Sequence, residues 1–388
     1  MAGLWCIIIV ALVAVAGPLI RPDSTPKANQ QVLEIKIKPA GFSVQMLKVR
    51  KNDDKPQKSF FTRFFKGTEN QYKLMPIYDY GFVGSDIIVE KYTGDKVNNG
   101  EKIKINIADV VYPIDYTESY EEATDNGMIS FTTFSGEKVT KSITELQKMI
   151  VDDNIYTQKY YLGTDQYGRD ILSRLMAGAW ISLLVGFIAV FISLVIGITM
   201  GAIAGYFKGW IDDLIMWIIN VVWSIPTLLL VIAITLAIGK DFWQVFIAVG
   251  LTMWVEVARV VRGQVIGLRE MEFIEAGNAL GFKSPRIIFR HILPNVMGPV
   301  IVISASNFAS AILIEAGLSF LGLGAPPPQA TWGKMINELR GYITTGHALL
   351  PILPGLCIMA MVLSFVLLGN GLRDALDTRS VEDLESKP

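Results

Sequence analysis

The sequence lacks a phosphate-binding loop: no G-x-x-x-x-G-K-S/T pattern occurs in its 388 residues. Any ATP chemistry would therefore belong to another protein. Cysteine and histidine are scarce, with two residues of each. Cys6 and Cys357 both lie in apolar stretches, so neither a disulfide framework nor a metal site is expected. The formal net charge is −1, and no basic stripe lies outside the short loops, so nothing indicates a nucleic-acid partner.

Apolar residues are abundant and unevenly distributed. The chain is 51% hydrophobic and 18% charged, with a mean hydropathy of +0.41. Several runs reach the length of about 20 residues that a bilayer-spanning helix needs, so we expect a polytopic membrane protein with six spans. The expected spans are residues 4–20, 181–206, 214–238, 242–261, 296–321 and 349–368.

The first of these runs, within residues 1–21, has one competing interpretation. Ala14-Val15-Ala16 resembles a signal-peptidase site, but the basic segment that opens a secretory signal is missing. A membrane anchor is therefore favoured.

Residues 22–161 differ from the rest in being polar throughout. Alternating patterns at 33–37, 102–107 and 129–134 are typical of half-buried strands, and 141–151 is predicted as a helix. We therefore expect a folded domain of β-rich or α+β type. Its aromatic cluster is interpreted as core, with a partner surface as the alternative; the cluster comprises Phe60, Phe61, Phe64, Phe65 and Tyr72.

The connection at residues 262–294 is basic and polar between two apolar runs. Lys- and Arg-rich short loops of membrane proteins face the cytoplasm, which predicts a cytoplasmic position for it. Residues 272–280 are predicted as a short helix with Phe273, Ile274 and Ala276 or Leu280 on one side. Gly281 suits a helix C-terminus, and Ser284 with Pro285 suits the start of the next helix. An amphipathic connector lying on the bilayer is the alternative.

Two strings carry a resemblance to a known family. Residues 275–281, E-A-G-N-A-L-G, followed by I-L-P at 292–294, resemble the E-A-A loop of ATP-binding-cassette (ABC) importer permeases, with Gly277 where Ala is usual. Residues 163–174, G-T-D-Q-Y-G-R-D-I-L-S-R, are similar to the dipeptide, oligopeptide and nickel branch of these permeases. Thr164 is expected to cap a helix along the outer membrane surface, with Asp165 and Asp170 offsetting Arg169 and Arg174.

The resemblance implies an all-α, six-span permease of the type I importer fold in the bacterial cytoplasmic membrane, with both termini in the cytoplasm. Residues 22–161 would be an extracytoplasmic insertion, which the resemblance does not cover. Residues 162–388 would be the permease core, ending in a cytoplasmic tail at 369–388. The implied ATPase-coupling residues are Glu275, Ala276, Gly277, Ala279, Leu280 and Gly281.

The same resemblance implies partners and leaves the substrate open. A second permease, two ATPase subunits that bind ATP and magnesium, and an extracytoplasmic solute-binding protein are expected. The chain itself would hold no cofactor or metal, would have no catalytic residue and would not be an enzyme. Di- or oligopeptides are the favoured substrates, with nickel chelates and other small solutes as alternatives.

Polar residues inside the expected spans suggest a transport path. Ser304, Asn307 and Glu315 lie near one helical stripe, as expected of a face turned to an aqueous path or to another helix. Glu256 is expected to pair with Arg259 rather than to line a pore. Pro226 predicts a kink near Ser224.

Two other functions are weighed against the importer. An ion-coupled secondary transporter would show repeated halves with broken helices and embedded carboxylates, whereas no convincing repeat is present and only Glu256 and Glu315 qualify. A membrane-tethered sensor built around residues 22–161 would not need five further spans.

Overall fold

The computed structural model of the chain describes residues 1–388 except 54–66, 95–96, 119–120, 124–126, 240–241 and 377–388. Four phenylalanines of the predicted aromatic cluster, at 60–65, and the end of the predicted tail lie outside the described residues. The chain forms two compact units. One comprises Met1–Val15 and Ala177–Pro388, and the other comprises Ala16–Met176.

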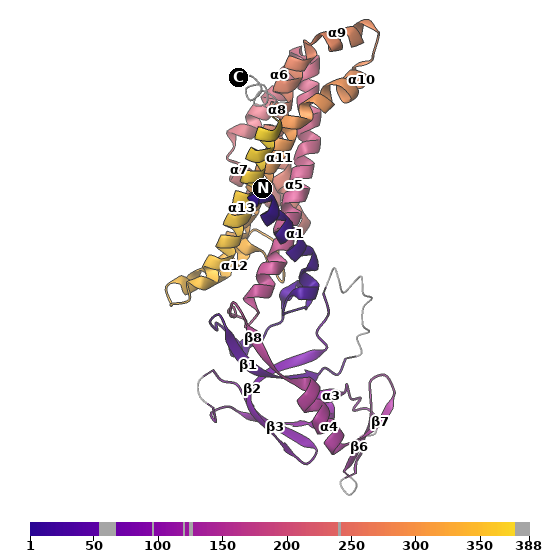
Figure 1. Cartoon of the computed structure of the whole chain (residues 1–388), viewed down its shortest axis with the longest axis vertical. Coiled ribbons are helices and arrows are strands. Elements are labelled where there is room, and N and C mark those ends of the chain that lie inside the picture. Colours follow the sequence, from indigo (N-terminus) through magenta and orange to yellow (C-terminus); the bar gives the residue numbers. More distant parts are fainter. Residues whose placement is uncertain (54–66, 95–96, 119–120, 124–126, 240–241, 377–388) are drawn as a thin grey trace, which may run out of the picture. The chain divides into compact units, whose positions relative to one another are not determined.

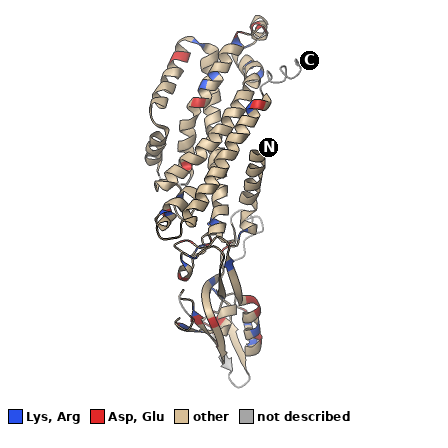
Figure 2. Ribbon diagram, turned by 60° about the vertical axis from the view of Figure 1, so that its left-hand side comes forward, with Lys and Arg blue, Asp and Glu red and all other residues tan. Residues whose placement is uncertain are grey.

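The first unit is helical (Figure 1). Its long helices carry few charged residues, as their mostly tan colour in Figure 2 shows. A helix pairs every backbone group within itself, which hydrocarbon surroundings require. The helices are α1 (Ala2–Ile20), α5 (Ile171–Phe207), α6 (Gly209–Ser224), α7 (Thr227–Ile238), α8 (Phe242–Arg269), α9 (Glu272–Ala279), α10 (Ser284–Ile287), α11 (Leu293–Phe320), α12 (Trp332–Leu339) and α13 (Leu349–Leu376).

Five helices are long and apolar enough to cross a membrane, and the described chain has six spans if the bent pair α6 and α7 counts as one. The axes of α6 and α7 differ by 95° at this break. Ile225 and Pro226 form the break with extended backbones, since Pro226 has no N–H for the helix to continue. The predicted kink is therefore confirmed in position and is much sharper than a bend in one helix.

One predicted boundary is wrong. The surface helix expected before residue 181 is part of α5, which runs for 37 residues without a break. The residues at 369–376, where the tail is expected to begin, continue α13 as helix. In both places helix-forming residues extend the helix beyond its most apolar part.

Helices α5 and α8 approach each other closely through a row of glycines. A Cβ atom on Gly197 would lie 2.5 Å from Val257 Cβ, and one on Gly201 would lie 2.5 Å from the Ala258 carbonyl oxygen. Gly205 repeats the contact at Val265, 2.8 Å from its Cβ. Small residues at this spacing let two membrane helices pack backbone to backbone.

The second unit is an α+β domain (Figure 1). Its main sheet is antiparallel throughout, with strand order β4-β3-β2-β1-β8, and a smaller sheet has the order β5-β6-β7. The elements are β1 (Phe42–Arg50), β2 (Tyr72–Val83), β3 (Asp86–Lys91), β4 (Lys102–Asn106), α3 (Ile107–Val111), β5 (Glu121–Ala123), β6 (Met128–Thr132), β7 (Lys138–Ser142), α4 (Ile143–Met149) and β8 (Ile155–Tyr160).

One face of the main sheet packs against α3 and α4. Its buried core includes Leu47, Ile87 and Val89 from the strands, with Ile107 and Leu146 from the helices. The alternation at 102–107 and 129–134 is confirmed by β4 and β6.

Two other predictions in this unit need correction. Residues 33–37 are not a strand: Leu33–Ile35 is a 3-10 helix, and Ile37 has a left-handed φ of 52°. Val32 and Ile35 are both buried, a spacing of three that suits the tighter helix. The helix predicted from 141 begins at Ile143 because the Ser142 hydroxyl accepts the Glu145 N–H at 3.1 Å and so caps it.

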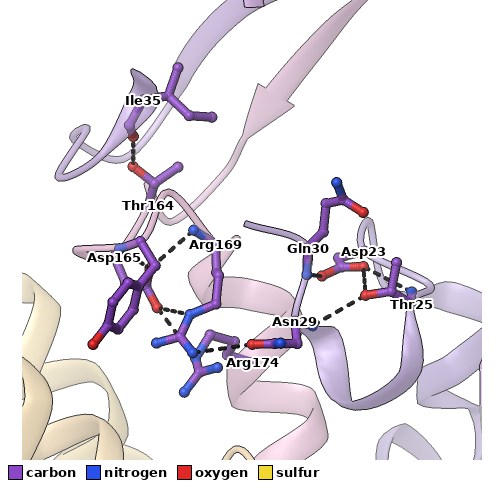
Figure 3. A network of polar contacts seen from close by, with 10 residues as sticks. Asp23, Thr25, Asn29, Gln30, Ile35, Thr164, Asp165, Arg169 and Arg174 are labelled. Carbon is purple, nitrogen blue, oxygen red and sulfur yellow. Dashed lines mark hydrogen bonds and ion pairs between the residues drawn. The ribbon is translucent and has the colours of Figure 1, made fainter. Parts of the chain in front are cut away.

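The string at 163–174 forms a polar network before α5 (Figure 3). Thr164 does not cap the helix. Its hydroxyl donates to the Ile35 carbonyl at 2.5 Å and accepts the Lys38 N–H at 2.9 Å. The cap is Asp170, whose Oδ2 accepts the Ser173 N–H at 2.8 Å. Burial raises the pKa of the Asp170 carboxyl, and the bonds from Ser173 oppose that rise.

Asp165 is the centre of the network. Its Oδ2 lies 2.6 Å from Arg169 Nε and 3.5 Å from Arg174 Nε, and all three side chains are buried. The prediction that Asp165 offsets the charges of Arg169 and Arg174 is therefore confirmed. Arg169 extends the network to the Asn29 side-chain oxygen at 3.3 Å (Figure 3).

Gly168 is required by this arrangement. Its φ is +70°, and an added Cβ would overlap the Val32 carbonyl oxygen. We predict that Gly168→Ala lowers the thermal unfolding midpoint of the detergent-solubilised chain far more than Gly136→Ala. Gly136 has a φ of +79° but open space around it, so its substitution should cost only the left-handed strain of about 1–2 kcal/mol. Equal midpoints for the two variants would contradict the overlap.

Candidate functional site

The loop at 262–294 folds largely as its pattern predicts. Helix α9 spans Glu272–Ala279, and Gly281 follows with a left-handed φ of +76°. The expected N-cap is wrong by one residue: α10 begins at Ser284, Lys283 precedes it, and no side chain caps it. From α10 the chain passes through a π-helical turn, Ile288–Ile292, directly into α11.

Helix α9 has two distinct faces. Ile274 and Gly277 are buried, and Ile274 joins a core formed with α5, α8 and α11. Phe273, Ala276 and Leu280 are exposed on the other side. The expectation that Phe273 and Ile274 share a face is wrong because consecutive helical residues point in different directions.

The largest side chains on the exposed face are apolar. Phe273 is 48% exposed and Leu280 is 73% exposed, and Phe289 of the π-helical turn is 71% exposed. Of the residues expected to couple to an ATPase, all but one are exposed, and Gly277 alone is buried; the exposed ones are Glu275, Ala276, Ala279, Leu280 and Gly281.

Ionic and cation–π contacts fix the helices that carry this loop. Arg262 binds Asp212 through two bonds of 2.6 Å, which joins α8 to α6. Bidentate pairs of this kind fix orientation as well as distance. Lys208, between α5 and α6, lies 3.0 Å from Glu270 after α8. The Arg286 guanidinium lies 4.3 Å from the Phe282 ring centre.

A cavity of about 300 Å³ lies at the bend between α6 and α7. Helices α8 and α11 complete its wall. The lining residues are Val222, Trp223, Ile225, Thr227, Leu230, Thr252, Met253, Val255, Glu256, Ser310, Leu313 and Ile314.

The polar stripe predicted on α11 does not line this cavity. Asn307 and Glu315 are 1% and 2% exposed, and Glu315 accepts the Ser319 hydroxyl at 2.6 Å. Ser304 is partly buried and donates to the Val300 carbonyl at 2.6 Å. Of the two alternatives, a face turned to neighbouring protein fits these contacts better than one turned to water.

The expected ion pair between Glu256 and Arg259 is absent from the described residues, and that prediction is wrong. Arg259 Nη2 instead donates to Asn220 Oδ1 at 2.8 Å, and its guanidinium lies 3.5 Å from the Trp223 ring centre. Both partners are on α6. Glu256 is exposed at the cavity.

Long apolar helices, one of them a broken span, define this chain as a polytopic membrane protein. The chain belongs to the family of binding-protein-dependent transport system inner membrane components, whose family model matches residues 197–381. It is thus a permease component of an ABC importer, and this membership carries the type I importer permease fold.

Two relatives support the assignment. The dipeptide transport system permease protein DppC of Alkalihalophilus pseudofirmus is 46% identical over 57% of this chain and 72% of its own length. The glutathione transport system permease protein GsiD of Escherichia coli O157:H7 is 42% identical over 57% of this chain and 73% of its own length. Nothing in these matches supports an ion-coupled transporter.

A search of solved structures also finds a chain of the MetNI methionine ABC transporter in an inward-facing conformation. Its TM-score is 0.44 at 19% identity, and the match covers 53% of this chain and 97% of that one.

Gly277 occupies a position with room for one more carbon. An added Cβ would lie 3.5 Å from Phe282 Cδ2, an ordinary contact. We predict that Gly277→Ala stabilises α9 by about 0.5–1 kcal/mol, because alanine loses less backbone entropy in a helix. Slower proteolysis of the loop in the purified protein would report this gain. Gly281→Ala is the matched control and should lose stability, since its φ is +76°; faster cleavage of Gly277→Ala would contradict the prediction.

Proposed function

We propose that the chain is one of two permeases in an ATP-driven importer of di- or oligopeptides, and that it couples to the ATPases through α9 and its Gly281 corner. The observation that carries the proposal is the exposed apolar face of Phe273, Ala276 and Leu280. Exposed apolar patches on an otherwise folded surface mark contacts with another protein or with a membrane, and the family's E-A-A loop favours a protein contact here. The names of the two relatives, a dipeptide and a glutathione permease, support the substrate class.

The proposed assembly contains a second permease, two ATPase subunits and an extracytoplasmic binding protein. ATP and magnesium would bind in the ATPase subunits, since this chain has no phosphate-binding loop. The chain itself breaks no bond and holds no cofactor.

The proposed orientation follows the charge of the loops. Arg262, Arg269, Lys283, Arg286 and Arg290 crowd the connection at 262–294, which favours its placement in the cytoplasm. An even number of spans then places both termini there. The α+β unit becomes an extracytoplasmic insertion after the first span, where extra contact with the binding protein is its proposed role.

In the proposed mechanism, closure of the ATPases displaces α9. Ile274 transmits the movement because it is packed in the core that α5, α8 and α11 share. These helices then move between outward- and inward-facing states. Ser310 and Leu313 of α11 face the path at the cavity, whereas Asn307 and Glu315 hold α11 against its neighbours.

Purification of the tagged chain from its native membrane tests the proposal. We predict that one or two ATPases and a second permease are recovered with the wild type, and that Leu280→Asp loses the ATPases because a charge enters the apolar contact. Ile343→Asp is the matched control: Ile343 is 53% exposed in the 3-10 helix after α12, and this variant should retain the ATPases. Recovery of the folded wild-type chain without any ATPase would refute the importer assembly. The binding protein recovered with it would separate peptides from nickel chelates as substrates.

The corner at Gly281 gives a separate prediction about coupling. Gly281→Val should strain the left-handed backbone and lower transport per ATP hydrolysed in proteoliposomes, while the variant still inserts in the membrane. Gly281→Asn should retain coupling, since asparagine tolerates this conformation. Wild-type transport by Gly281→Val would show that the corner geometry is not needed.

A further inference from the structure

Glu256 is a carboxylate in an unusual position. It lies near the middle of α8, between Val255 and Val257, and it is exposed. Ionisable residues at such depth are costly, and they typically face a cavity or pair with another charge. Among the residues that the structure describes, no cation lies within 4.0 Å of this carboxylate.

The neighbouring arginine is held elsewhere. Arg259 is one helical turn from Glu256, which is close enough for a pair in principle. Its bond to Asn220 and its position on the Trp223 ring direct the guanidinium to α6. Glu256 thus faces the cavity without an ion pair to Arg259.

The other residues that line the cavity suit the uncharged part of a small ligand. Thr227, Thr252 and Ser310 bring hydroxyls, and the Trp223 indole and Leu313 bring apolar surface. The volume of about 300 Å³ is at the lower end of small-ligand sites. A short solute with one cationic end fits this combination of charge, hydroxyls and size.

We propose that Glu256 binds the protonated amino group of the transported solute in the cavity at the α6–α7 bend. This inference rests on the proposed function and names the chemical class that the path recognises, a primary ammonium group such as the free N-terminus of a short peptide. The carboxylate supplies a charge-assisted bond to that ammonium group.

Binding to the purified complete complex, without the binding protein, tests this role. The probes are alanyl-alanine and N-acetyl-alanyl-alanine, which differ in the charged amino group, and calorimetry measures both affinities. We expect the wild type to bind the free dipeptide roughly tenfold more tightly or better, a gap typical of one charge-assisted bond. Glu256→Gln should reduce the ratio to about one, and Glu256→Asp should restore part of it.

Asp374→Asn is the matched control, because Asp374 is an exposed carboxylate near the end of α13, away from the cavity lining. It should keep the wild-type ratio. Recovery of the ATPases and normal basal ATP hydrolysis show that each variant complex is assembled. A change in the ratio of the two dipeptide affinities is therefore distinguished from a failure of the importer to assemble.

Three results would overturn the inference while leaving the importer intact. They are equal affinity of the wild type for both dipeptides, no detectable binding of alanyl-alanine, and an unchanged ratio in Glu256→Gln. A Glu256→Gln complex that loses its second permease would also overturn it, because Glu256 would then pair with a cation of that subunit.

Discussion

The close contact between α5 and α8 is the constraint on which the helical unit depends. Gly197, Gly201 and Gly205 bring the two backbones together at positions where a single Cβ would overlap Val257, Ala258 or Val265. In a membrane, such packing replaces the hydrophobic effect as the force that joins helices. Helix α8 is therefore held along its length, and it presents Glu256 at the cavity and leads into α9 at its end. The candidate binding residue therefore lies on the helix that leads into the candidate docking helix.

The break at Ile225 and Pro226 has the opposite character. Helices α5 and α8 leave no space between them, whereas a cavity lies at the sharp turn between α6 and α7. Two short helices at 95° cover less of α8 and α11 than one straight span would. The cavity wall then exposes residues that a straight helix would cover. The same region redirects Arg259 to Asn220 and Trp223. One proline thus bears on both the cavity and the position of the Arg259 side chain.

The string at 163–174 has a different structural role from the surface helix that the sequence predicted. Gly168 and Thr164 contact the backbone of the segment at 32–38, and Asp165 balances Arg169 and Arg174. Buried pairs of this kind are costly to break, since removal of one partner leaves a charge without compensation. The string anchors a loop before α5 rather than a helix on a membrane surface.

Several features followed from the sequence alone, because local chemistry determines them. Apolar runs located the spans, Pro226 located the break, and the glycine at 281 predicted a left-handed corner that the structure contains. The expectation of a β-rich or α+β domain followed from alternation in short segments, and the structure contains an α+β unit. The assignment to a permease family, first suggested by two strings, is supported by the family model and by relatives with 42–46% identity.

Tertiary structure decided which residues meet. The spacing of Glu256 and Arg259 predicted an ion pair. The arginine side chain is long enough to reach another helix, however, and Arg259 contacts Asn220 and Trp223 of α6 instead. The division of α9 into a buried and an exposed face, and the burial of Asn307 and Glu315, depend on neighbours distant in the chain. Local sequence determines the backbone of an element, whereas the packing of distant elements determines which side chains remain free to bind.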